Sequence, residues 1–266
     1  MYNILRELLS DRKGDIIFKC FGHIHILYII LTFGGIVLTI FLLKNKSDKT
    51  KQKVISLTIN IVFILYILDF FLMPFAYGEI DLEKLPFHIC TSMCVMCFLS
   101  RHNKFLSKFK TQFILLGLVG NIIYVIYPAG VGWYQISPFT YRVIQTLSYH
   151  SLMTAFCIYS LAFDDIKLRW KNIYKELLMI IALVIWSLIG NYLYQGAVDN
   201  YLFNWFFTVQ DPFGMFDLNI SRVIMPFVMT AVIFIVVVLI YLVYFFILKI
   251  VNKNNIIQKQ KEIPHV

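Results

Sequence analysis

Residues 85–100 read LPFHICTSMCVMCFLS, an apolar segment that opens with a proline, a histidine and a cysteine. Pro86 suits the first turn of a helix, where its missing N–H has no partner to lose. His88 and Cys90 then lie where the chain would enter hydrocarbon. Polar side chains are costly in lipid without partners, so they mark candidate functional sites. The stretch predicts a membrane helix that carries a site near its beginning.

Apolar runs of the same kind extend through the rest of the chain. Hydrophobic residues make up 59% of the 266 residues, and charged residues make up 15%. A helix that spans a membrane needs about 20 apolar residues. We therefore predict an all-α fold, a polytopic membrane helical bundle with about seven transmembrane helices. The predicted helices are residues 21–43, 54–77, 85–100, 111–127, 138–163, 173–194 and 222–248.

The apolar runs divide the chain into three regions. Residues 1–20 are predicted to form an N-terminal amphipathic segment, with Ile4, Leu5 and Leu8 on one face. Residues 21–249 form the seven-helix membrane domain, and residues 250–266 form a basic cytoplasmic tail.

Lys and Arg are concentrated in alternate connectors. The connectors after the first and third runs hold five and four of them, the region after the fifth run holds four when Lys175 is included, and the tail from Lys249 holds four. By contrast, the connector after the second run holds only Lys84, the one after the fourth run holds none, and Arg222 is the one basic residue after the sixth run. Basic connectors remain in the cytoplasm. We therefore expect a multi-pass protein of the cell membrane with its N-terminus outside and its C-terminus cytoplasmic, although the N-terminal segment's own four basic residues run against this rule. Because the net charge of +9 follows this topology pattern, we expect no nucleic-acid binding.

This orientation gathers polar side chains in the outer half of the bilayer. They come from five helices and include His23, His25, Asp69, His88, Cys90, Asn191 and Arg222. His150 lies about 12 residues into the fifth run, near the midplane at roughly 1.5 Å per residue. Either that helix begins later or the site is a deep funnel. The aromatic outer connectors, residues 128–138 and 195–221, are predicted to form a rim or lid.

The fifth run carries a polar stripe. Its members, Arg142, Gln145, Thr146, Tyr149 and His150, fall within an arc of roughly 140° on a helical wheel. Such a stripe must face the interior of the bundle or a wet cavity. On a regular helix His88 and Cys90 point to opposite sides, so a base for the Cys90 thiol must come from another helix. The pattern predicts His150 as that base.

A thiol and a histidine on different inward-facing helices are the parts of nucleophilic acyl transfer. Cys90 would hold the acyl group, close to a helix N-terminus where the backbone dipole favours a thiolate. Asn191, Arg142 or a backbone N–H would stabilise the oxyanion.

Simpler interpretations fit several of these residues. Cys90, Cys94 and Cys97 are spaced as a packing stripe, and a buried histidine is usually hydrogen-bonded rather than catalytic. Ion pairing is the simpler role for Asp69, Arg142 and Arg222. A metal site built from His25, His88, Cys90 and His150 lacks ligand spacing, so we expect neither metal nor cofactor.

The LPFHIC stretch resembles the LP-x-H-[LI]-C signature of the YwaF-like integral membrane proteins, bacterial relatives of the transmembrane-protein-164 acyltransferases. Later landmarks occur in the same order: Tyr127-Pro128, Tyr149-His150, Gly190-Asn191-Tyr192 and Asp211-Pro212-Phe213. After Asn191 the chain departs from the pattern, because YLYQGAVDN stands where a shorter turn is expected.

The resemblance implies a lipid acyltransferase of the transacylase type, which moves a fatty acyl chain between membrane phospholipids through an acyl-cysteine. It carries Cys90 and His150 over as nucleophile and base. The residues expected to bind substrate or an oxyanion are His25, His88, Arg142, Gln145, Asn191, Tyr192, Asp211 and Arg222. Three alternatives remain open: an acyl-ester hydrolase, a small-molecule or lipid transporter or receptor that uses the same cavity, and a structural partner in a larger membrane complex.

Overall fold

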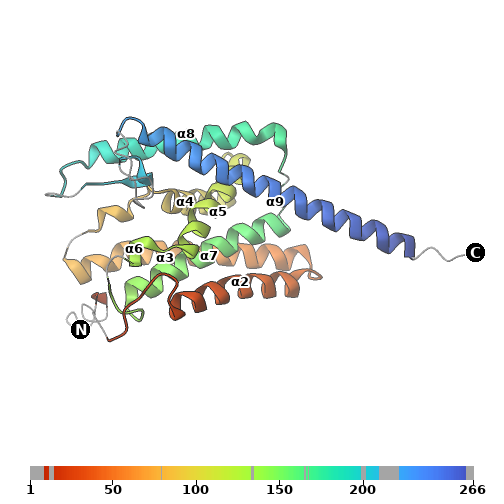
Figure 1. The fold of residues 1–266 in the computed structure, drawn as a ribbon, viewed down its shortest axis with the longest axis horizontal. Helices are drawn as coiled ribbons and strands as arrows, with labels where there is room; N and C mark the ends of the chain where they lie inside the picture. The colour runs from red at the N-terminus through yellow and green to blue at the C-terminus, as the bar shows by residue number, and fades with distance from the viewer. Residues whose placement is uncertain are drawn as a thin grey trace, which may run out of the picture.

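Long helices account for most of the chain (Figure 1). This computed structural model describes residues 9–11, 15–78, 80–132, 135–164, 166, 168–198, 202–209 and 222–261, with the backbone alone for residues 76, 77, 129 and 251–261. Within them lie seven helices of 14 residues or more: α2 (His23–Leu43), α3 (Asp48–Tyr77), α4 (Ile89–His102), α5 (Lys110–Ile126), α7 (Tyr141–Phe163), α8 (Ile173–Leu193) and α9 (Met225–Lys261). The short elements are η1 (Leu82–Lys84), η2 (Leu106–Phe109), α6 (Ala129–Gly132), η3 (Trp170–Asn172) and η4 (Trp205–Phe207).

The seven helices lie where the apolar runs predicted them. At its C-terminal end α9 is longer than expected and continues to Lys261, beyond the rest of the bundle in Figure 1. The amphipathic residues Ile4, Leu5 and Leu8 lie outside the described residues.

Five of these described helices are long and apolar enough to cross a membrane. The candidate spans are His23–Leu43, Asp48–Phe75, Leu106–Gly132, Trp170–Leu193 and Met225–Ile250. The two remaining helices are α4 and α7. With 14 residues α4 is about 21 Å long, short of the roughly 30 Å of a hydrocarbon core. α7 is long enough, but it carries the predicted polar stripe.

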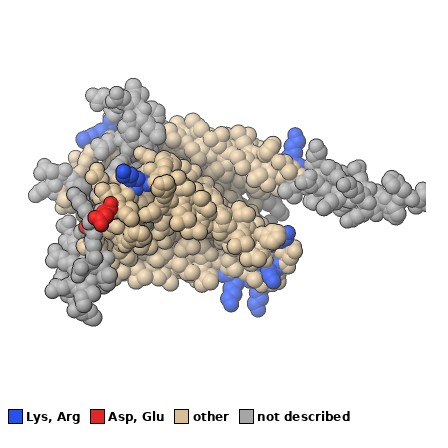
Figure 2. Space-filling view, turned by 60° about the horizontal axis from the view of Figure 1, so that its bottom comes forward, with Lys and Arg blue, Asp and Glu red and all other residues tan. Residues whose placement is uncertain are grey.

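The outer helices expose apolar side chains that a soluble protein would bury. On α2, Leu31 and Val37 are 63% and 66% exposed, and on α9 Phe227 is 72% exposed. On the face drawn in Figure 2, Lys and Arg lie toward the ends of the molecule and leave a broad uncharged belt between them. These features are those of a polytopic membrane bundle.

Two glycines bring α4 and α7 close to α5, the most buried of the candidate spans. A Cβ at Gly117 would lie 3.0 Å from Met153 Cε and 3.2 Å from Cys157 Sγ of α7. A Cβ at Gly120 would lie 2.8 Å from Ile89 Cγ2 and 3.2 Å from Cys90 Sγ of α4. The start of α4, with Cys90, is therefore held against the second half of α5.

The opposite end of the bundle is joined by charges. Asp164, which follows α7, pairs with Arg101 of α4 at 3.3 Å and with Lys110 of α5 at 2.9 Å. Gln52 of α3 donates to the same carboxylate at 2.6 Å. This network fixes four helices at the end where most of the lysines and arginines lie.

Candidate active site

A cavity of about 420 Å³ lies at the end of the bundle where α3 and α5 end and α4, α7 and α9 begin. Cys90 and His150 both line this cavity, which is called the main cavity below. Three of the residues predicted to bind substrate or an oxyanion, His88, Arg142 and Gln145, line it as well. One wall is apolar and comes from Met229, Val232 and Ile233 of α9.

His88 and Cys90 reach the main cavity together because α4 begins later than predicted. The helix starts at Ile89, so the prediction of a start at Pro86 is wrong. His88 is the N-cap, with an extended backbone at φ −78° and ψ 150°. Because it is not part of the helix, the helical-wheel argument that placed His88 and Cys90 on opposite sides does not apply. The carbonyl of Pro86 instead accepts from Ser92 Oγ at 2.6 Å and from Trp186 Nε1 at 2.7 Å.

His150 is held by α5. Its Nδ1 lies 2.7 Å from Asn121 Oδ1, and its ring stacks on Tyr124 with centroids 3.9 Å apart and planes at 16°. The predicted fifth helix corresponds to α7, which begins at Tyr141 rather than Pro138. His150 is therefore three residues nearer the start of its helix than predicted, and its expected depth in the membrane is smaller.

Tyr149, the residue before His150, connects the two helices that carry the catalytic candidates Cys90 and His150. The Tyr149 hydroxyl donates to the backbone carbonyl of Cys90 at 3.1 Å, which joins α7 to α4 at this point. Among the described residues no hydrogen bond connects Cys90 Sγ directly to the His150 ring. What the thiol and the imidazole share is the main cavity.

Three of the charged side chains that line the main cavity, Asp69, Lys84 and Arg142, are in ion pairs. Asp69 and Lys84 form an ion pair of 2.7 Å, and Arg142 pairs with Asp11 at 3.1 Å. Ion pairing was the simpler prediction for Asp69 and Arg142, and it is confirmed. Tyr66 donates to the carbonyl of Lys84 at 2.9 Å, which fixes the η1 segment over α3.

The segment around η4 covers part of the main cavity. Phe206 and Phe207 line it and have positive φ values of 58° and 54°, a left-handed conformation that is strained for bulky residues. The backbone N–H of Phe206 donates to His88 Nδ1 at 3.3 Å. This described part of the 195–221 connector therefore lies where a lid was predicted.

Asn191 binds this segment rather than the main cavity. Its Nδ2 donates to the Trp205 carbonyl at 3.2 Å and to Thr208 Oγ1 at 2.8 Å, and its Oδ1 accepts from Trp205 N at 3.0 Å. The amide is thus used to hold the loop, and it does not line the main cavity.

Three other predicted residues that the structure describes, His25, Tyr192 and Arg222, do not line the main cavity either. Both ring nitrogens of His25 are engaged, since Nδ1 accepts from Phe21 N at 2.9 Å and Nε2 lies 2.9 Å from the Val125 carbonyl. Tyr192 is 79% exposed on the outside of α8, and Arg222 is exposed ahead of α9. Asp211 lies outside the described residues.

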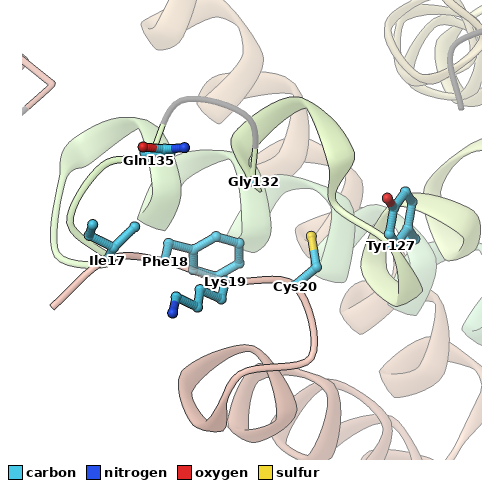
Figure 3. A pocket seen from close by; sticks show the side chains of 7 residues that line it. All are labelled: Ile17, Phe18, Lys19, Cys20, Tyr127, Gly132 and Gln135. Carbon is cyan, nitrogen blue, oxygen red and sulfur yellow. The ribbon is translucent and has the colours of Figure 1, made fainter. Parts of the chain in front are cut away.

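A second cavity of about 440 Å³ is lined by residues 17–20 on one side and by Tyr127, Gly132 and Gln135 on the other (Figure 3). Tyr127 lines both cavities, so the two adjoin at this residue. Cys20 Sγ lies 3.8 Å from the Pro128 carbonyl, and a Cβ at Gly132 would be only 2.8 Å from that sulfur. A larger residue at position 132 would therefore force Cys20 to shift.

Asn121 and Tyr124 are site residues that were not predicted from the sequence, and Phe206 was predicted only as part of the 195–221 connector. An amide within an apolar run was the available signal for Asn121, by the same reasoning that singled out His150. The aromatic residues carried no such signal, because rings are abundant throughout the chain: 25 Phe and 16 Tyr.

Comparison with known proteins gives one result. A search of the curated proteins and a search of the solved structures each returned no match. The model of the TMEM164 family matches residues 18–249, a range that includes every described residue that lines the main cavity. The chain therefore belongs to the TMEM164 family.

Proposed function

We propose that this protein is a membrane-embedded acyltransferase that moves a fatty acyl chain between phospholipids through a thioester on Cys90. The observation that carries the proposal is that Cys90 and His150, from two different helices, line one cavity with an apolar wall. The resemblance of LPFHIC to a transacylase signature supports the same chemistry.

In the first half-reaction His150 accepts the Cys90 thiol proton as the sulfur attacks the ester carbonyl carbon of a donor lipid. The carbon–oxygen bond then breaks, and the protonated imidazole returns its proton to the departing alcohol oxygen. A thioester on Cys90 and a lysolipid result. A small rotation of either side chain, or a bridging water in the main cavity, completes the proton path, as is common where no substrate is bound.

In the second half-reaction the hydroxyl group of an acceptor lipid gives its proton to His150 and attacks the thioester carbon. The carbon–sulfur bond breaks, and the sulfur regains a proton from the imidazole. If water takes the place of the acceptor, the product is a free fatty acid and the protein is a hydrolase. Acyl transfer and hydrolysis thus differ only in whether a lipid hydroxyl group or water attacks the thioester.

A candidate donor for the oxyanion lines the same cavity as Cys90. If His88 Nδ1 accepts from Phe206 N–H, its Nε2 carries a proton, because a neutral imidazole has one nitrogen of each kind. His88 also lines the main cavity. We propose that this N–H stabilises the oxyanion, and that Met229, Val232 and Ile233 contact the start of the acyl chain.

We also propose that the protein lies in the cell membrane with the main cavity toward the outer leaflet. The connectors at the opposite end carry most of the Lys and Arg residues, including those around Asp164. Such an end faces the cytoplasm. The N-terminus is then outside and the C-terminus inside.

Purified protein reconstituted with a fluorescent-acyl phospholipid and an unlabelled lysolipid tests the proposed reaction. We expect labelled product and a hydroxylamine-sensitive label on the protein. Both should disappear in Cys90→Ala, and the rate should fall about 10²-fold or more in His150→Ala. Cys97→Ala is the matched control, because Cys97 is buried on the same helix but does not line the main cavity.

The products distinguish the alternatives. Labelled fatty acid without labelled phospholipid indicates hydrolysis. If Cys97→Ala lost as much activity as Cys90→Ala, the Cys90 thiol would act only through packing. Saturable uptake or ligand stabilisation that persists in Cys90→Ser, without acyl transfer, would replace this proposal with transport or reception.

A further inference from the structure

Asn121 is an amide on α5 that the reaction scheme does not use. It is completely buried, and both ends of its side chain are engaged. Nδ2 donates to the Gly117 carbonyl at 2.7 Å, and Oδ1 faces His150 Nδ1 at 2.7 Å. An amide this deep in a membrane bundle is costly to retain unless it serves a purpose.

The Gly117 carbonyl determines which way the amide points. A carbonyl oxygen can only accept a hydrogen bond, so the NH₂ group of Asn121 must face it. The amide oxygen is then directed at His150 Nδ1, and because that oxygen can only accept, Nδ1 must be the nitrogen that carries the proton. In a neutral imidazole the other nitrogen, Nε2, then holds the lone pair.

His150 Nε2 has no hydrogen bond among the described residues, and the ring lines the main cavity. Stacking on Tyr124, at 3.9 Å and 16°, fixes the plane of the ring. We infer that Asn121 is a positioning residue that holds His150 in the tautomer with Nε2 ready to accept a proton. The inference deepens the proposed function and rests on it for the identity of the proton, which is that of the Cys90 thiol.

The same contact serves the step after proton transfer. When Nε2 has taken the proton, both ring nitrogens are donors, and Nδ1–H still points at the Asn121 oxygen. The imidazolium therefore keeps its hydrogen bond without any rearrangement of the site. In the opposite tautomer, the Nδ1 lone pair would face the lone pairs of Oδ1.

Nitrogen NMR of ¹⁵N-histidine-labelled protein in detergent or lipid tests the tautomer directly. The His150 signals are identified by their absence from His150→Gln. We expect a neutral ring that is protonated on Nδ1 in the wild type, and loss of this preference in Asn121→Leu, which has a similar volume and no acceptor. A ring protonated on Nε2 in the wild type would overturn the inference, whatever the protein's activity.

Kinetics test the consequence. In the acyl-transfer assay Asn121→Leu should lower kcat about tenfold or more, with KM changed less than about threefold. Asn121→Asp should recover most of kcat with a shifted pH profile, since it offers Nδ1 an oxygen and, as the neutral acid, still donates to Gly117. The matched control is Asn60→Leu, which makes the same substitution at an amide on another helix, α3. This variant should behave as the wild type.

The outcomes separate the two proposals. If neither wild type nor variants transfer acyl groups but the tautomer is as expected, the proposed function fails and the arrangement of His150 stands. If acyl transfer occurs and Asn121→Leu retains it while folded, the positioning role is wrong. Equal loss in Asn121→Leu and Asn60→Leu, with lowered melting temperatures, would reduce Asn121 to a packing residue.

Discussion

Gly190 lies against the ring of Phe87, where a Cβ on residue 190 would be 2.5 Å from the ring carbons Cγ and Cδ1. Phe87 has little room to withdraw, because Trp186 and Trp205 flank it with ring centroids 4.9 Å away. Phe87 directly precedes His88, and Trp205 directly precedes Phe206. The contact between α8 and Phe87 therefore sets the position of two groups that line the main cavity.

Gly190→Ala is expected to destabilise the protein by about 1–3 kcal/mol, the usual cost of overpacking a filled interior. The melting temperature in detergent measures this change. Gly34→Ala is the control, since a Cβ there meets no atom within 4 Å, and it should leave stability unchanged or slightly raised. A Gly190→Ala variant as stable as the wild type would contradict the packing described.

Asn191→Ala should release the η4 segment, because it removes three hydrogen bonds to Trp205 and Thr208. Hydrogen exchange of residues 202–209 should become faster, and a water-soluble thiol reagent should reach Cys90 more quickly. Leu193→Ala, at a residue 65% exposed on the same helix, should change neither rate. Unchanged exchange in Asn191→Ala would mean that other contacts hold the loop.

Lys84→Ala should be strongly destabilising, because it leaves Asp69 charged and only 3% exposed without its partner. Breaking a buried ion pair costs about 3–5 kcal/mol. Asp69→Asn combined with Lys84→Met should restore part of this loss. Lys51→Ala provides the comparison: its partner Asp48 is on the surface, so its effect should stay below about 1 kcal/mol. Similar losses in both single variants would show that Asp69 is hydrated.

Burial raises the pKa of the Cys20 thiol above its ordinary value. The thiolate is the reactive form, so alkylation of Cys20 should need a higher pH than alkylation of a free cysteine. Measuring the rate against pH in a Cys90→Ser background, with Cys20→Ser as the blank, gives the midpoint. A midpoint at or below about 8.5 would contradict the burial of this sulfur.

The positions of the helices could be read from the sequence, because hydrocarbon requires long apolar runs and basic connectors mark their ends. The same rule is least informative for α4 and α7. One is short and the other polar, since neighbouring helices rather than lipid surround much of their surface. Cys90 and His150 could still be singled out, as polar groups within apolar segments.

Contacts between segments that are distant in the chain could not be predicted from the sequence. His88 joined Cys90 in one cavity only because the helix starts one residue after it, and a shift of three residues in a predicted helix start is too fine for a periodicity argument. Asn191 was assigned to substrate from its type, although its partners, Trp205 and Thr208, come from a loop whose fold no local pattern specifies.

The shortness of α4 bears on how the protein's sidedness must be mapped. Five and seven crossings are both odd numbers, so reporters fused to the two chain ends would give opposite compartments under either count. A reporter inserted in residues 103–109, between α4 and α5, answers the question instead. Because Arg101 pairs with Asp164 at the end opposite the main cavity, we expect this reporter to be cytoplasmic, and an external reporter would contradict the crossing of α4.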